Sequence, residues 1–129
     1  MSNPKGLITP KQAKTLNDAY TARCELISQE ITKRPDNRSS WYSLEDLRTY
    51  LALAEAQAKE LGYEMDGIRI YCGAYPEENG KAGYSTSFIV PTINESQGKD
   101  GSGSSPDMPG GNGLNLGGQG NPPGANYPQ

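Results

Sequence analysis

Residues 67–75 read Gly67-Ile-Arg-Ile-Tyr-Cys-Gly-Ala-Tyr75, and this stretch decides the fold class. Apolar residues alternate here with arginine and aromatic residues, which is the period of two that is typical of a β-strand. A second stretch, residues 83–92, alternates in the same way. The connector from Pro76 to Lys81 is rich in turn-forming residues. We therefore predict a β-hairpin, with Pro91 either ending the second strand or marking an edge strand.

Two helices are predicted before the hairpin. Thr9 followed by Pro10 is a helix start, and apolar residues then recur at helical spacing to about Lys33. Ser43 is the expected N-cap of the second helix, and Gly62 is placed to close it in the left-handed conformation. Because both helices precede the strands, the predicted fold class is α+β: two helices followed by a β-hairpin.

The apolar faces of the two helices are expected to form the core. We predict that they pack against each other, and that apolar residues of the hairpin cover the pair. A short helix seam between two copies is the alternative. The residues assigned to this core are Leu16, Ile27 and Ile31 from the first helix, Leu47, Leu51 and Leu61 from the second, and Ile68, Ile70 and Phe88 from the hairpin.

The composition changes sharply near residue 96. Residues 96–129 hold 10 of the 16 glycines and 5 of the 10 prolines, with few apolar residues. Such a composition buries too little surface to offset the entropy of ordering, so it predicts a disordered low-complexity tail. The expected organisation is a flexible N-terminal arm at 1–8, a small domain at 9–95 and the tail at 96–129. The arm is also a candidate for a short extra strand.

Composition excludes several classes of function. The chain has no histidine, so triads of the Ser-His-Asp type and most zinc sites lack a required residue. The acidic residues are explained by helix starts and turns. We therefore expect no catalytic activity and no cofactor or metal. The chain has 12 basic and 15 acidic residues, so it lacks the excess of positive charge that binding to duplex nucleic acid requires.

The cysteine pattern and the hydropathy indicate a cytoplasmic protein. Cys24 and Cys72 are too few for a disulfide framework and too far apart for a CxxC motif, so we expect both to be small buried residues. No apolar run approaches the ~18–20 residues that span a bilayer, and no signal peptide is recognisable. No membrane association is expected.

The candidate binding residues combine aromatic rings with arginine. Such residues stack on bases in single-stranded nucleic acid platforms and also dominate protein interfaces. Helices covering the strand face would instead make the aromatic residues part of the core, and all three interpretations stay open. The candidates are Arg38, Trp41 and Tyr42 between the helices, and Arg69, Tyr71 and Tyr75 on the first strand.

Residues 35–92 contain three motifs that resemble a group of small bacterial hypothetical proteins. These proteins combine a W-[WY]-S-[LK]-x-D helix start with a G-[IL]-R-[IL]-Y-x-G-x-[YH]-P strand and a closing F-x-V-P-T. The corresponding residues here are Trp41 to Asp46, Gly67 to Pro76 and Phe88 to Thr92. The group has no assigned activity, so the resemblance implies only that the helix and hairpin form one module.

The function predicted from the sequence is a non-catalytic protein-interaction module. Its contact is either the aromatic and basic surface or the hairpin edge, and its partner is an unidentified protein. The alternative is a binder of single-stranded nucleic acid or a small anionic ligand, in which Arg69 meets negative charge and Tyr71 and Tyr75 stack on rings. A homodimer is possible, because a lone hairpin is marginal in water and leaves an open edge.

Overall fold

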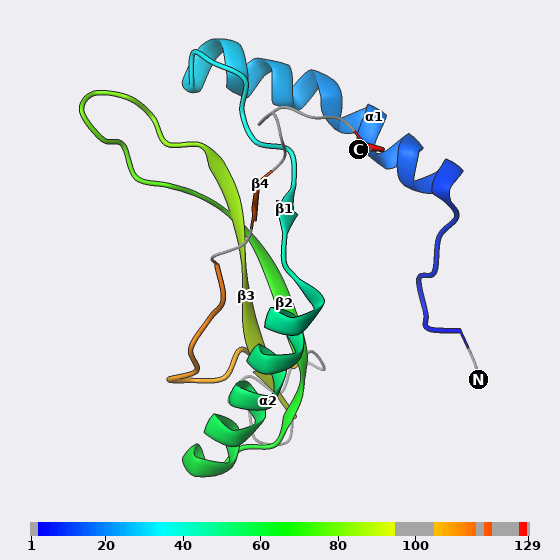
Figure 1. Cartoon of the computed structure of the whole chain (residues 1–129), viewed down its shortest axis with the longest axis vertical. Helices are drawn as coiled ribbons and strands as arrows, with labels where there is room; N and C mark the ends of the chain where they lie inside the picture. Colours follow the sequence, from blue (N-terminus) through cyan, green and yellow to red (C-terminus); the bar gives the residue numbers. More distant parts are fainter. Residues whose placement is uncertain (1–2, 95–104, 116–117, 120–126, 129) are drawn as a thin grey trace.

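The computed structural model describes residues 3–94, 105–115, 118–119 and 127–128 (Figure 1). β2 and β3 form a long antiparallel hairpin, and β1 pairs with β4. Two α-helices precede the hairpin, which confirms the α+β class. The elements in chain order are α1 (Pro10–Leu26), the π-helical η1 (Ile27–Ile31), β1 (Ser40–Trp41), α2 (Leu44–Leu61), β2 (Met65–Ala74), β3 (Ser85–Ile93) and β4 (Gly118–Gln119).

The helix boundaries follow the predicted capping signals. Thr9 and Gln12 form a capping box at the start of α1, where the Gln12 backbone N–H donates to Thr9 Oγ1 at 3.2 Å. Ser43 Oγ accepts from the Asp46 backbone N–H at 2.9 Å and caps α2. Gly62 closes α2 with φ 83°, in the left-handed region that glycine adopts without strain.

The hairpin turn lies between Glu78 and Lys81. Their backbones exchange two hydrogen bonds of 2.9 and 3.0 Å across Asn79 and Gly80, whose φ angles are 53° and 75°. Asn-Gly is the preferred pair where both central residues of a tight turn need positive φ.

Pro91 does not end β3, which continues to Ile93 and is bordered on both sides. In an antiparallel strand, the N–H and C=O of one residue point to the same side. The Pro91 carbonyl accepts a hydrogen bond from Met108 N. The Pro91 nitrogen, which carries no hydrogen, therefore also faces residues 105–115 and not β2. The ladder to β2 therefore passes through Pro91, which stands opposite Ile68.

Residues 105–115 lie along β3, which corrects the expectation of disorder for this part of the tail. Ile89 and Leu114 exchange two backbone hydrogen bonds of 2.9 and 2.8 Å, and Ile93 N donates to Pro106 O at 2.9 Å. Met108 is buried. The predicted disorder of 96–104, 116–117, 120–126 and 129 lies outside the described residues.

The core lies between α2, β3 and residues 105–115, not between the two helices. One cluster contains the buried residues Tyr50, Ala54 and Ile89, with Tyr42, Leu47, Met65 and Leu114 packed against it. The second contains Ala58, Ile93 and Met108, with Tyr63 and Met65 beside it. The Tyr50 hydroxyl donates to Asn112 O at 2.9 Å, so the core also holds the glycine-rich segment in place.

We predict that the stability falls above pH 10 and that Tyr50→Phe weakens this dependence. Burial raises the pKa of the Tyr50 phenol above its ordinary 10.0, because the phenolate would lose its solvation. The Tyr50 phenol has a higher pKa in the folded protein than in the unfolded chain, where the pKa is about 10. Its contribution to the stability is therefore fully present below pH 10 and is lost as the pH rises through the pKa of the folded protein. Urea unfolding at a series of alkaline pH values measures the slope. Because the pKa values of Tyr20 and Tyr71 are also raised, the slope should shrink without vanishing; identical slopes for the two proteins would contradict the prediction.

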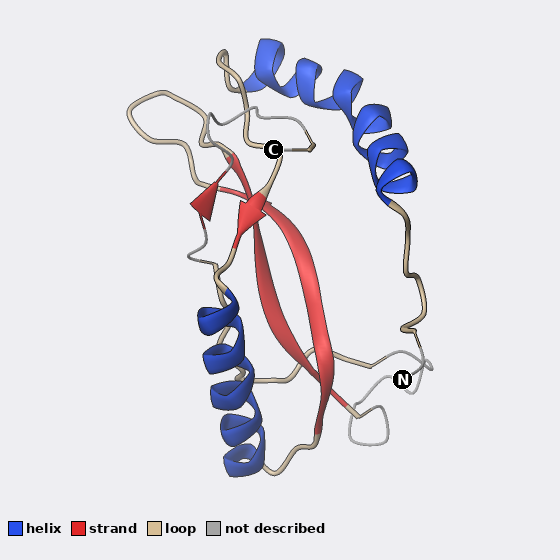
Figure 2. Ribbon diagram, turned by 45° about the vertical axis from the view of Figure 1, so that its right-hand side comes forward, coloured by secondary structure: helices blue, strands red, loops and turns tan. Residues whose placement is uncertain are grey.

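The predicted packing of α1 against α2 is wrong. α1 lies at the end of the hairpin nearest its turn and α2 lies at the other end (Figure 2). Leu16 and Ile31, assigned to the helix interface, are exposed. The physical reason is the extended segment between the helices, which bonds to the start of β3 and so separates the helices along the hairpin.

Residues 3–8 precede α1 without belonging to any strand. Within the described residues, no helix combines the length and the apolar character that crossing a membrane requires.

Candidate interaction surface

The outer edge of β2 has its main-chain groups directed away from β3. In β3, Ile89 and Ile93 bond to residues 105–115, whereas Asn94 N donates to Glu64 O on the β2 side. Because these directions alternate along a strand, Val90 faces β2, where its register partner is Arg69. The residues of β2 between these paired positions then direct their N–H and C=O groups outward. They are Ile68, Ile70, Cys72 and Ala74.

The side chains of these four residues are exposed, contrary to prediction. Ile68 is 40% exposed and Ile70 is 66% exposed. Cys72 is an exposed free thiol, whereas Cys24 is buried as expected. The alternation predicted a buried apolar face, but the buried clusters join α2 to β3 and residues 105–115, and of the β2 residues only Met65 packs against them. We call these side chains and their outward main-chain groups the β2 edge surface.

The flank of α2 nearest β2 adds apolar area to this side of the molecule. A groove of about 560 Å³ between α2 and residues 112–114 is lined by Thr49, Leu53 and Gln57. These residues mark the flank of the helix that faces away from β2. Leu51, which is 38% exposed, lies on the opposite flank by helical spacing. It was predicted to be a core residue and is only partly covered.

Arg69 and Tyr71 lie on the other face of β2 and share one carboxylate. Arg69 Nη1 and the Tyr71 hydroxyl both donate to Asp107, and Arg69 Nη2 donates to Ser105 O at 2.8 Å. The hydrogen bond to Asp107 raises the pKa of both the Arg69 guanidinium and the Tyr71 phenol. The Tyr71 ring stacks on Phe88 with centroids 5.2 Å apart. These bonds engage Arg69 within the chain.

The remaining aromatic candidates do not form one surface with this pair. Trp41 is 67% exposed on β1. Tyr42 packs against the core, and its hydroxyl donates to Ser87 O at 3.2 Å. The Tyr75 hydroxyl donates to Asn115 Oδ1 at 3.3 Å. The six predicted residues are therefore not gathered at one site.

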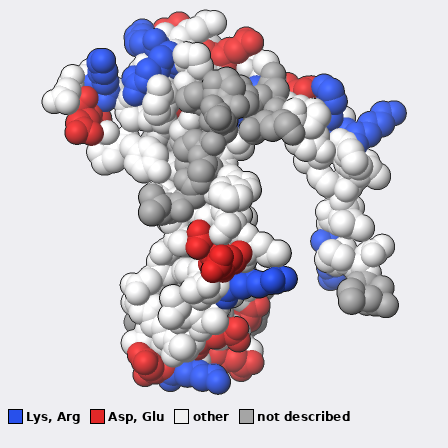
Figure 3. Space-filling view, viewed as in Figure 1, with Lys and Arg blue, Asp and Glu red and all other residues white. Residues whose placement is uncertain are grey.

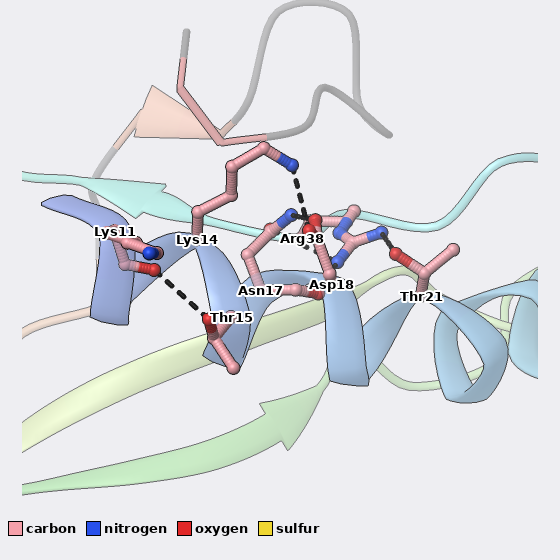
Figure 4. A network of polar contacts seen from close by, with 7 residues as sticks. All are labelled: Lys11, Lys14, Thr15, Asn17, Asp18, Thr21 and Arg38. Carbon is pink, nitrogen blue, oxygen red and sulfur yellow. Dashed lines mark hydrogen bonds and ion pairs between the residues drawn. The ribbon is translucent and has the colours of Figure 1, made fainter.

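Arg38 fastens the segment after α1 back onto that helix (Figure 4). Its Nη1 donates to Thr21 Oγ1 at 3.1 Å, and its Nη2 donates to the main-chain and side-chain oxygens of Asn17 at 2.7 and 3.1 Å. The guanidinium also lies 5.4 Å from the centroid of the Tyr20 ring. On the same helix, Lys14 and Asp18 form an exposed ion pair of 2.8 Å, which lowers the pKa of Asp18.

A buried junction between the two halves of the chain was missed in the sequence. Asp36 is fully buried, and it accepts from the Ser85 backbone N–H at 2.7 Å and from the Ser85 hydroxyl. Asn37 Nδ2 donates to Ser85 O at 3.1 Å. Arg34 donates to Ala82 O at 3.0 Å and lies over the Tyr84 ring. A run of polar residues after a helix does not indicate, from the sequence alone, which distant backbone groups it will bond to.

We predict that Asp36→Ala lowers the free energy of unfolding by about 1–3 kcal/mol, because the partly buried Ser85 donors lose their acceptor. Urea denaturation followed by circular dichroism measures the change. The matched control is Asp18→Ala, which removes an exposed ion pair and should have a much smaller effect. Equal losses in the two variants would show that the junction does not stabilise the fold.

A cleft of about 350 Å³ is lined by residues of α1, of the segment 37–40 and of the hairpin. Tyr20, Arg38, Cys72 and Ser87 contribute to its lining. Asn37 Oδ1 and Arg38 Nε are buried beside it without a hydrogen-bond partner among the described residues. In the part of the chain that the structure describes, no group of three or more Cys, Asp or Glu residues is arranged to hold a metal ion.

Charged side chains of both signs are interspersed over the visible face, over α1 and over the lower part of the molecule (Figure 3). Among the described residues, this face carries no extended basic patch of the kind that tracks a nucleic acid backbone. Asp107 was also missed in the sequence, because a single acidic residue in a glycine-rich tail that also contains Asp100 gives no sign of its partner.

Comparisons with known proteins do not assign the chain to a family: no family model matches it, and no curated protein and no solved structure matches it.

Proposed function

We propose that this chain is a non-catalytic protein-interaction module that binds an extended segment of a partner protein along the β2 edge surface. The observation that carries the proposal is an outward-facing main-chain edge lined by the exposed side chains of Ile68 and Ile70. An added strand would pair with these main-chain groups, and its apolar side chains would cover the isoleucines.

The energetics favour this surface over the other exposed apolar residues. Covering the exposed part of Ile70 contributes about 1–2 kcal/mol to the binding free energy. The main-chain hydrogen bonds in addition fix the orientation of the added strand. Isolated exposed residues such as Leu53 or Trp41 offer a similar area but no row of backbone donors and acceptors. The two free cysteines favour a reducing compartment, and we propose a cytoplasmic location on that ground.

The alternative, a binder of single-stranded nucleic acid or a small anionic ligand through Arg69, has less support. Arg69 Nη1 and Nη2 are bonded to Asp107 and to Ser105 O. A phosphate approaching this face would meet the Asp107 carboxylate beside the guanidinium. That repulsion weakens the phosphate contact that this kind of binding requires.

The experiment compares affinity capture by the full chain with capture by two variants. Ile70→Lys places a charge in the middle of the β2 edge surface, and Leu53→Lys places the same charge on the far flank of α2. We expect the partner to be recovered with the native chain and with Leu53→Lys, and to be lost with Ile70→Lys.

Hydrogen exchange then tests the contact directly. In the complex, the backbone amides of Ile68, Ile70 and Cys72 should exchange more slowly than in the free protein. The proposal would be overturned if the native chain and the Ile70→Lys variant recovered the same proteins. It would also be overturned if hydrogen exchange at these amides were unchanged in the complex.

A further inference from the structure

We infer that the partner strand is the same strand of a second copy of this chain, so that two β2 edges pair antiparallel about a two-fold axis at Ile70. The inference rests on the proposed function, because it names the occupant of the β2 edge surface. A two-fold interface requires a patch that is complementary to itself, and the register of this edge meets that requirement.

The main-chain groups fit such a pairing. Residues that exchange both hydrogen bonds stand opposite each other in an antiparallel pair. With the axis at Ile70, this residue stands opposite its own copy, and Ile68 stands opposite Cys72 of the second copy. All three residues direct their N–H and C=O groups outward. In the part of the chain that the structure describes, no main-chain hydrogen bond is made to this edge, so each copy supplies what the other lacks.

The side chains fit on both faces of the joined sheet. On one face, Ile70 meets Ile70, and Ile68 meets the Cys72 side chain, so the exposed apolar row of each copy covers that of the other. On the opposite face, Arg69 stands opposite Tyr71 of the second copy, and both side chains keep their bonds to Asp107 within their own chain.

The charge of Arg69 favours the register with the axis at Ile70 over the register shifted by one residue. If the axis moved by one residue to Arg69, two guanidinium groups would stand directly opposite each other, which is destabilising. With the axis at Ile70, Asp66 stands opposite Ala74 and no like charges meet. The pairing joins two two-stranded sheets into one sheet of four strands.

Cysteine cross-linking tests the register. In the full chain with Cys72→Ser, Ile70→Cys places two thiols on the axis, at a Cα separation of ~5.5 Å that a disulfide can bridge. Mild oxidation should convert most of this variant to a covalent dimer. The matched control is Ala74→Cys in the same background: it lies on the same face and edge but far from its own copy, and it should form no covalent dimer.

Sedimentation equilibrium of the full chain tests the association itself. We expect a monomer–dimer equilibrium that Leu53→Lys leaves unchanged and that Ile70→Lys weakens at least ~10-fold, since two lysines would meet on the axis. Circular dichroism checks that the variants are folded, which the exposure of Ile70 favours.

The outcomes separate this inference from the proposed function. A native chain that sediments as a monomer at every concentration, with no covalent dimer of Ile70→Cys, overturns the second copy as partner. If Ile70→Lys still abolishes capture of a different protein, the β2 edge surface remains the contact and the occupant is heterologous. If capture is also insensitive to Ile70→Lys, both proposals fail.

Discussion

Ile93→Ala is expected to lower the free energy of unfolding by about 2–5 kcal/mol. Ile93 is 1% exposed and packs with Ala58 and Met108, so the deleted atoms leave a cavity bordered by α2, β3 and residues 105–115. Three segments that are distant in the sequence meet there, and none can move alone to fill the space. Urea denaturation monitored by circular dichroism measures the change.

Leu51→Ala is the matched control for Ile93→Ala. Leu51 is 38% exposed on the flank of α2, and we expect a loss below about 1 kcal/mol. Helical periodicity alone assigns Leu51 to the core, so the two variants discriminate between the periodic pattern and the observed packing. A larger loss for Leu51→Ala than for Ile93→Ala would contradict the position of the core.

Truncation after Ser104 is expected to destabilise the fold by about 3 kcal/mol or more, from the lost burial of Met108 together with newly exposed surface on Ile89 and Ile93. The free edge of β3 would also become available for aggregation. Thermal unfolding should lose its sharp transition, and light scattering should detect oligomers.

A chain truncated after Asn115 provides the control, because it keeps the bonds of residues 105–115 to β3 and the Tyr50 contact with Asn112. We expect it to retain most of the stability of the full chain. If the chain ending at 104 were as stable as the chain ending at 115, the glycine-rich segment would be a passive extension and the core described above would be wrong.

Local signals in the sequence were sufficient for the two α-helices and the hairpin, but not for η1, β1 or β4. Thr9 and Ser43 mark helix starts because their side-chain oxygens satisfy free backbone N–H groups within the next turn, and Gly62 ends a helix because of its own backbone freedom. The alternation from Ile68 onward identified β2 because successive strand residues point to opposite faces. Each of these causes acts within a few residues.

The candidate surface was only partly predictable for the same reason. Arg69 and Tyr71 were singled out correctly as neighbours on one strand face, but their bonds to Asp107 involve a residue more than thirty positions away. The hairpin edge was expected to be open, yet the sequence could not say which of its sides α2 would cover.

The sequence by itself determined the two helices, the hairpin and the two-sided pattern of β2, because capping, turn chemistry and periodicity are short-range effects. Only the tertiary structure decided that α1 and α2 lie apart, that Met108 is buried and that Ile70 is exposed. These outcomes depend on which segments compete for the same apolar surface. Residues 105–115 occupy the place beside β3 and α2 that periodicity had assigned to the first helix, and among the described residues no strand pairs with the outer edge of β2.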